Sequence, residues 1–178
     1  MLSGAPQALF HLSGFLPGVL LAGFWYLFLH RSRTSMWRIA LLALPGTFVH
    51  ELMHFIFGLF LLAKPAGFSV WPRHSGKGWT LGSVSFQRIG LLNGAFVALA
   101  PLLLFPLAWL CLIRFAVPFW VQHRWGWWLV AGYGTATMLF AALPSCQDIR
   151  LGSRSLVFYG VIGGLGWWGL SAWRAWLH

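Results

Sequence analysis

The five residues His50-Glu51-Leu52-Met53-His54 have the types and spacing of a zinc site. A helix advances about 3.6 residues per turn, so His50 and His54 project from one face, where they can share a Zn²⁺ ion, while Glu51 lies beside them. The chain has only two acidic side chains among 178 residues, Glu51 and Asp148. The motif therefore predicts a metal centre with an adjacent carboxylate.

A catalytic zinc site usually has three protein ligands, and this motif supplies two. We predict Asp148 as the third, because coordination to a dication offsets the free-energy cost of placing a carboxylate beside a bilayer. A salt bridge from Asp148 to Arg150 or Arg154 is the alternative. Cys146 is the reserve ligand. Five further histidines are candidates that lie near expected span ends or in loops: His11, His30, His74, His123 and His178.

These residues suit the hydrolysis of an acyl bond. One zinc ion per chain would activate a water molecule, and Glu51 would take its proton as general base. A metal-binding transporter or sensor is a second interpretation, but transport usually needs a chain of polar groups across the membrane and this sequence has one cluster. A proteolytically inactive scaffold is a third, although a scaffold has no need of the base.

The composition indicates a membrane protein. Hydrophobic residues make up 59% of the chain and charged residues 8%, against roughly 25% charged in soluble domains. Apolar runs of about 20 residues recur, each long enough to cross a bilayer as a helix. The net charge of +10 comes from Lys and Arg residues between these runs, where lipid headgroups would meet them. Nucleic acid is therefore not an expected partner.

We expect an all-α polytopic membrane protein with one domain over residues 1–178. Five transmembrane helices are predicted at about residues 9–29, 37–63, 89–116, 126–143 and 155–177. The zinc motif lies near the middle of the second span. Asp148 is expected on a broken or non-helical segment after Pro144, because proline cannot continue a helix. Glycines in the last span, from Gly160 to Gly169, predict close helix packing.

Residues 64–88, between the second and third spans, are expected to form a short membrane-associated β-hairpin. Turn residues at 75–78 precede a run from Trp79 to Gln87 that alternates at the period of a strand. A substrate helix must unwind before it is cut, and in lipid its freed backbone needs new partners. An exposed strand edge supplies them, so Gly82, Ser83, Val84 and Ser85 are predicted to bind substrate. An ordinary interfacial loop is the alternative.

From about Met36 to Gly152 the chain resembles the site-2 proteases, a family of intramembrane zinc metalloproteases. The resemblance rests on the zinc motif within a span, the hairpin-like segment, the stretch from Asn93 to Pro101 and an aspartate after a proline. It implies that His50, His54 and Asp148 are metal ligands and Glu51 the base, and it adds Asn93 to the expected substrate-binding residues. Asp148-Ile149 and Ala100-Pro101 stand where the family usually has Asp-Gly and Gly-Pro, which marks a divergent and minimal member.

The resemblance also implies a partner and an orientation. The expected substrate is a transmembrane protein cut in or near its span. The hairpin and Asp148 would face the cytosol, with the N-terminus cytosolic and the C-terminus outside. Basic residues are equally divided between the two sides of a five-span chain, so charge does not decide the orientation. An accessory regulator or a second copy of the chain is a further partner that the sequence allows.

Overall fold

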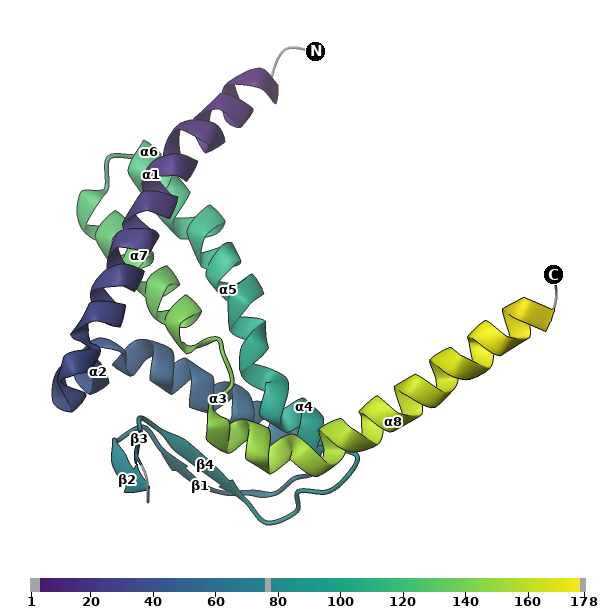
Figure 1. Ribbon diagram of the computed structural model, residues 1–178. Helices are drawn as coiled ribbons and strands as arrows, with labels where there is room; N and C mark the ends of the chain where they lie inside the picture. Colours follow the sequence, from purple (N-terminus) through teal and green to yellow (C-terminus); the bar gives the residue numbers. More distant parts are fainter. Residues whose placement is uncertain (1–3, 76–77, 177–178) are drawn as a thin grey trace.

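A computed structural model describes residues 4–75 and 78–176, and most of these residues are helical. The mostly helical fold that the sequence predicts is therefore confirmed. Figure 1 shows α7 between α1 and α5, with α3 crossing below these three helices. The α-helices are α1 (Gly4–Arg31), α2 (Met36–Leu42), α3 (Leu44–Phe60), α4 (Gly94–Leu99), α5 (Leu104–Cys111), α6 (Val117–Val121), α7 (Trp125–Ala141) and α8 (Cys146–Trp176).

Shorter helical segments connect some of these helices. The 3₁₀ segment η1 (Ser32–Thr34) joins α1 to α2, and a second 3₁₀ segment, η2 (Ala100–Leu103), joins α4 to α5. A π-helical segment, η3 (Leu112–Ala116), follows α5. Because η2 contains Pro101, which lacks a backbone donor, the tighter 3₁₀ turn occurs where an α-helical hydrogen bond is missing.

Three helical segments are long and apolar enough to cross a membrane: Ser13–Thr34, Gly94–Val121 and Cys146–Trp176. The pair α2 and α3 is a fourth if it is counted as one bent span. Three to four candidate spans are compatible with a multi-pass membrane protein, but the five predicted spans are not confirmed. The fourth predicted span is the 17-residue helix α7, which at 1.5 Å per residue is about 25 Å long, short of the roughly 30 Å hydrocarbon core.

The second predicted span is bent by 71° between α2 and α3. Pro45 lies in the first turn of α3, so it cannot continue the hydrogen bonding of α2. The hydroxyl of Tyr133 on α7 donates to the carbonyl of Leu42 at the end of α2. A Cβ atom at Gly46 would overlap the backbone of Thr137. The bend and this close approach together seat the first turn of α3 against α7.

Two antiparallel ladders occupy the segment between α3 and α4. Strand β1 (Pro65–Ser69) pairs with β4 (Ser83–Phe86), and β2 (Arg73–Ser75) pairs with β3 (Gly78–Thr80). The predicted turn at 75–78 includes residues 76 and 77, which lie outside the described part. The expected single strand over 79–87 is wrong, because it breaks at Leu81 and Gly82. Leu81 packs against the core cluster of Leu29, Ile39, Ala43 and Ala136, which turns the chain inward.

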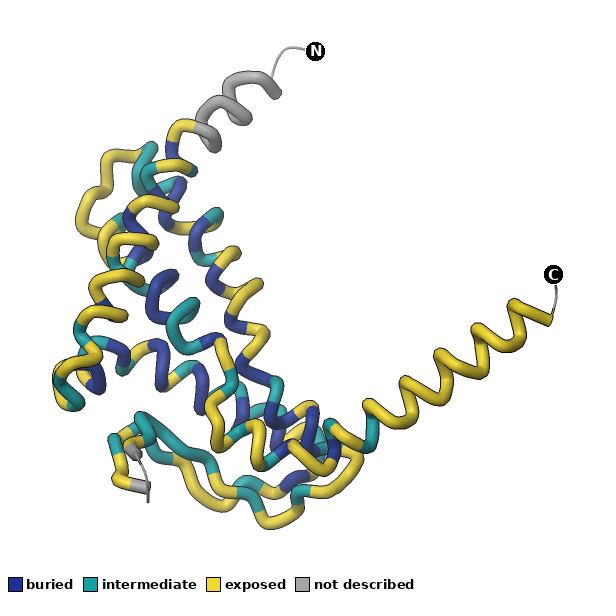
Figure 2. Tube along the Cα trace, in the orientation of Figure 1, coloured by how far each residue is buried: buried dark blue, intermediate teal, exposed yellow. Residues whose placement is uncertain are grey.

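The sheet lies against α3, and α8 leaves the rest of the molecule. In Figure 1 the strands run below α3, and the ring of Phe86 lies against Gly58. The start of α8 packs on α4, where a Cβ at Gly152 would overlap Ala98. Beyond that contact α8 is exposed (Figure 2). A Cβ added at Gly160, Gly163, Gly164, Gly166 or Gly169 would meet no atom of another element within 4 Å, so the packing predicted from these glycines is not made within the described chain.

Candidate metal centre

Helix α3 buries the three polar residues of the sequence motif at the point where several elements meet. The exposed fractions of His50, Glu51 and His54 are 8%, 6% and 2%. The two histidines lie one helical turn apart, and their Nε2 atoms are 3.2 Å from each other. The predicted spacing therefore places both imidazoles at one point.

Backbone carbonyls orient both rings. The Nδ1 atom of His50 lies 2.6 Å from the carbonyl oxygen of Ala141, and the Nδ1 atom of His54 lies 2.8 Å from that of Val97. A carbonyl oxygen can only accept a hydrogen bond, so both Nδ1 atoms carry the proton and donate it. In the neutral rings the lone pairs are therefore on the Nε2 atoms, which is the tautomer of a histidine that binds metal through Nε2.

Asp148, in the first turn of α8, lies beside the two histidines. Its Oδ2 atom is 3.4 Å from His50 Nε2, and its Oδ1 atom is 3.1 Å from His54 Nε2. The three residues form one group that could hold a metal ion, with ligand atoms within 4.8 Å of one another. Ligands about 2.0–2.1 Å from a tetrahedral zinc ion are separated by roughly 3.3 Å. The imidazole nitrogens are 3.2 Å apart and each lies 3.1–3.4 Å from a different oxygen of Asp148, which is compatible with a metal ion bound between the three side chains.

The first turn of α8 positions the Asp148 carboxylate. The backbone N–H of Ser145 donates to Asp148 Oδ2 at 2.6 Å, and the N–H of Asp148 donates to Ser145 Oγ at 3.2 Å. These reciprocal bonds form a capping box at the start of the helix. The expectation that Asp148 lies on a non-helical segment is therefore wrong. Pro144 is followed by Ser-x-x-Asp, a helix-start signal that the sequence interpretation missed.

The alternative partners of Asp148 are not observed. Among the described residues its ion pairs are with His50 and His54, and none is formed with Arg150 or Arg154. Cys146 is exposed and does not belong to the group of clustered ligands. His30, His74 and His123 each lie against an aromatic ring, of Tyr26, Trp79 and Trp125 respectively. The side chain of His11 and the whole of His178 lie outside the described part of the chain.

Glu51 faces two cavities beside the three clustered residues. A small cavity of about 30 Å³ is lined by Glu51, His54 and Asp148 together with β4 residues, and a space of this size holds about one water molecule. A second cavity of about 270 Å³ is lined by His50 and Glu51 on one side. Glu51 is thus a buried carboxylate next to the three clustered residues and next to two cavities.

The structure brings most of the predicted substrate-binding residues to this site. Gly82, Ser83 and Val84 line the small cavity, and a Cβ at Gly82 would lie 2.7 Å from Cγ and Oε1 of Glu51. Ser85 is exposed and pairs with Gly67 of β1. In the described part of the chain β4 pairs only with β1, which leaves its other edge without a strand.

Asn93 lies away from the cavities that Glu51 lines. Its Nδ2 atom donates to the carbonyls of Arg88 at 2.9 Å and Leu61 at 3.3 Å, and its Oδ1 atom accepts from the N–H of Gly90 at 2.7 Å. These bonds close the loop that precedes α4. Asn93 therefore holds the chain between the sheet and the next helix, and the structure does not bring it to Glu51.

Fold and site together describe a mostly helical, membrane-compatible protein with a buried group of two histidines and one aspartate that could bind a metal ion. No family model, curated protein or solved structure matches this chain. The clustered residues and the cavities beside them are therefore the features that bear on function.

Proposed function

We propose that this protein is an intramembrane zinc metalloprotease of the site-2 type, which hydrolyses a peptide bond in or near a transmembrane segment of another protein. One observation carries the proposal. The Nε2 atoms of His50 and His54 and the carboxylate of Asp148 are separated by 3.1–3.4 Å beside the buried Glu51. Two imidazoles and one carboxylate with a position left for water are a known ligand set of catalytic zinc.

Each residue of the site has a distinct role in this reaction. His50, His54 and Asp148 would hold one zinc ion, which as a Lewis acid supplies polarisation of the scissile carbonyl and activation of water. Glu51 accepts the proton of the attacking water and returns it to the leaving amide nitrogen. The carbonyls of Ala141 and Val97 keep the two imidazoles in the required tautomer.

The free edge of β4 is the proposed substrate-binding surface. A transmembrane helix satisfies its backbone groups internally, so it must unwind before one of its peptide bonds is cut. An unwound segment that adds to β4 regains hydrogen bonds through the strand's unpaired N–H and C=O groups. Gly82, Ser83 and Val84 would then align that segment beside Glu51, because they line the same cavity.

The proposal includes a membrane arrangement. We take α7 as a short fifth span that crosses beside α1 and α5, with the hairpin associated with the membrane and the N-terminus in the cytosol. The exposed part of α8 would be covered by lipid or by another helix, from a substrate, a regulator or a second copy of the chain. Exposed apolar side chains such as Leu165, Trp167 and Leu170 on α8 support contact with lipid.

Comparison of wild type with Glu51→Gln tests the proposal. Membrane proteins of cells that express either form would be compared by mass spectrometry for fragments that end in or beside a transmembrane segment. The proposal predicts such fragments with the wild type and none with the variant, while both proteins purify with one zinc ion per chain. Equal zinc and no difference in fragments would favour a metal transporter, a sensor or an inactive scaffold.

A further inference from the structure

The larger cavity beside Glu51 contains one cationic side chain. This cavity, of about 270 Å³, is formed by the segment after α1, by α3, by the chain around β3 and by the end of α7. Arg33 of η1, which is exposed, borders this cavity together with apolar residues that include Trp79, Leu81 and Leu143. The same space is therefore bordered by the proposed catalytic base and by a guanidinium group.

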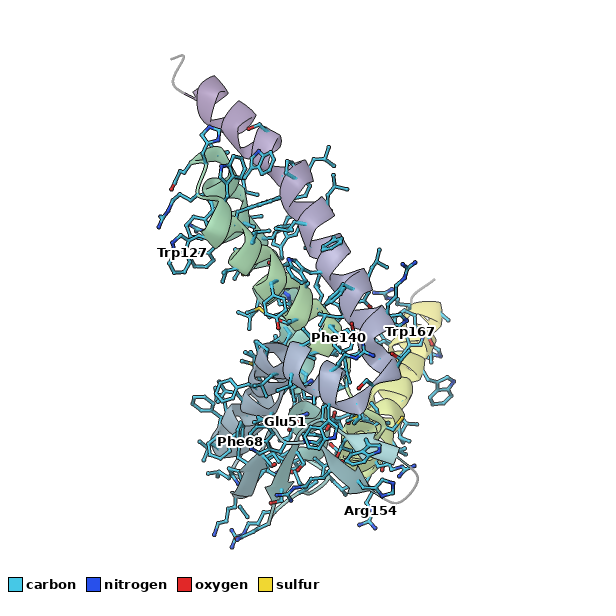
Figure 3. The ribbon with its side chains drawn as sticks, turned by 90° about the vertical axis from the view of Figure 1, so that its left-hand side faces the viewer. Glu51, Phe68, Trp127, Phe140, Arg154 and Trp167 are labelled. Atoms are coloured by element: carbon cyan, nitrogen blue, oxygen red, sulfur yellow. The ribbon has the colours of Figure 1, made fainter. Side chains whose placement is uncertain are left out.

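The Arg33 guanidinium is held by an aromatic ring. Its Cζ atom lies 4.6 Å from the centre of the Phe140 ring, a distance at which a cation is attracted to the ring face. Phe140 packs in turn on Tyr26 and on the core cluster that contains Ala136. Figure 3 shows Phe140 at the end of α7 that lies nearer to Glu51. The contact with the packed Phe140 ring therefore restricts where the Arg33 charge can lie.

Arg33 pairs with no carboxylate among the residues that the structure describes. The chain has only two acidic side chains, Glu51 and Asp148. Among the described residues the ion pairs are those of Asp148 with His50 and His54. Glu51 borders the same cavity but forms no ion pair with Arg33, so the guanidinium is free to attract a negative group from a bound molecule.

We propose that this cavity binds a peptide segment with an acidic side chain, and that Arg33 is the residue that selects it. The inference deepens the proposed function, on which it rests: the acidic residue would lie close to the bond that is cut, because Arg33 and Glu51 border one cavity. The apolar walls accept the neighbouring membrane residues. Aspartate and glutamate are rare within transmembrane segments, so this contact distinguishes one class of segment from most others.

Binding of model peptides to the purified protein tests this proposal without any need for cleavage. The probes are fluorescent ten-residue apolar peptides with a single Asp at each position in turn, and a matched set with Asn. In neutral micelles the wild type should bind the Asp peptide about three- to tenfold more tightly at one or two positions, the range of a partly exposed charged hydrogen bond.

Three variants locate the effect. Arg33→Gln should remove the preference for Asp, whereas Arg38→Gln should keep it, since Arg38 is exposed on α2 and does not line the cavity. Arg33→Glu should bind the equivalent Lys peptide more tightly than the Asp peptide. Each variant is compared with the wild type in zinc content and thermal unfolding, so that a misfolded protein is recognised and the remaining variants decide.

Equal affinity for Asp and Asn peptides at every position would overturn the proposal, and so would a preference that persists in Arg33→Gln. Loss of the wild-type preference on addition of phosphatidylglycerol, but not phosphatidylcholine, would identify the cavity as a lipid headgroup site and would also overturn it. A protein that binds Asp peptides through Arg33 but cuts nothing would contradict the proposed function alone. A protein that cuts without this preference would contradict only the role of Arg33.

Discussion

Replacement of Gly82 by alanine tests whether Glu51 acts as the catalytic base. The added methyl group would lie 2.7 Å from Cγ and Oε1 of Glu51, whereas ordinary carbon contacts are close to 4 Å. The Glu51 side chain must therefore move by about 1 Å. A misplacement of this size in a reacting group lowers the rate by about 100-fold, which corresponds to about 2.7 kcal/mol in the activation free energy.

The assay compares cleavage rates at equal zinc content. A substrate identified from the Glu51→Gln comparison would be reconstituted with purified wild type or Gly82→Ala. The three atoms nearest to this methyl group all belong to Glu51, so zinc binding should be unchanged. Gly67→Ala is the matched control, because its methyl group would lie equally close, at 2.7 Å, to the Ser85 hydroxyl, which can rotate away from it. Wild-type activity of Gly82→Ala at full zinc occupancy would refute this placement of the base.

Three further predictions concern the ligands and the strand edge. His54→Ala should lower the affinity for zinc by more than the roughly 10–100-fold expected when an outer partner of a ligand is lost. Elemental analysis of the purified variant checks this prediction, and a full zinc ion per chain would show that His54 is not a ligand. Asp148→Asn should weaken zinc binding and abolish cleavage, whereas Cys146→Ser should do neither; the reverse pattern would make Cys146 the third ligand. One of the two variants Ser83→Pro and Val84→Pro should suppress cleavage while zinc stays bound, because proline deletes a backbone donor at the free edge. Normal cleavage by both variants would exclude strand addition.

The sequence was informative where local spacing decides geometry. Four-residue spacing on a helix predicted that His50 and His54 share one point, and α3 places them there. The scarcity of carboxylates pointed to Asp148, and the structure brings it to the same point. Its helical setting was also within reach of the sequence, since Ser145 three residues earlier is a capping-box residue.

Contacts between distant segments were not predictable in the same way. The carbonyls of Ala141 and Val97 that orient the histidines lie 91 and 43 residues away along the chain. Any residue type carries such a carbonyl, so it leaves no signal in a single sequence. The contact between Gly82 and Glu51 likewise depends on how the strands fold back against α3. The bend within the second predicted span was not predicted either, although Pro45, in the first turn of α3, cannot continue the hydrogen bonding of α2.

Cleavage by purified protein in liposomes tests the central claim most directly. Wild-type protein and Glu51→Gln, each loaded with one zinc ion per chain, would be reconstituted with the same transmembrane substrate, and the new termini would be read by mass spectrometry. We predict that the wild type cuts the substrate in or beside its membrane segment, that a zinc chelator stops the reaction and added zinc restores it, and that Glu51→Gln with full zinc does not cut. Equal cleavage by zinc-loaded wild type and Glu51→Gln would contradict the account.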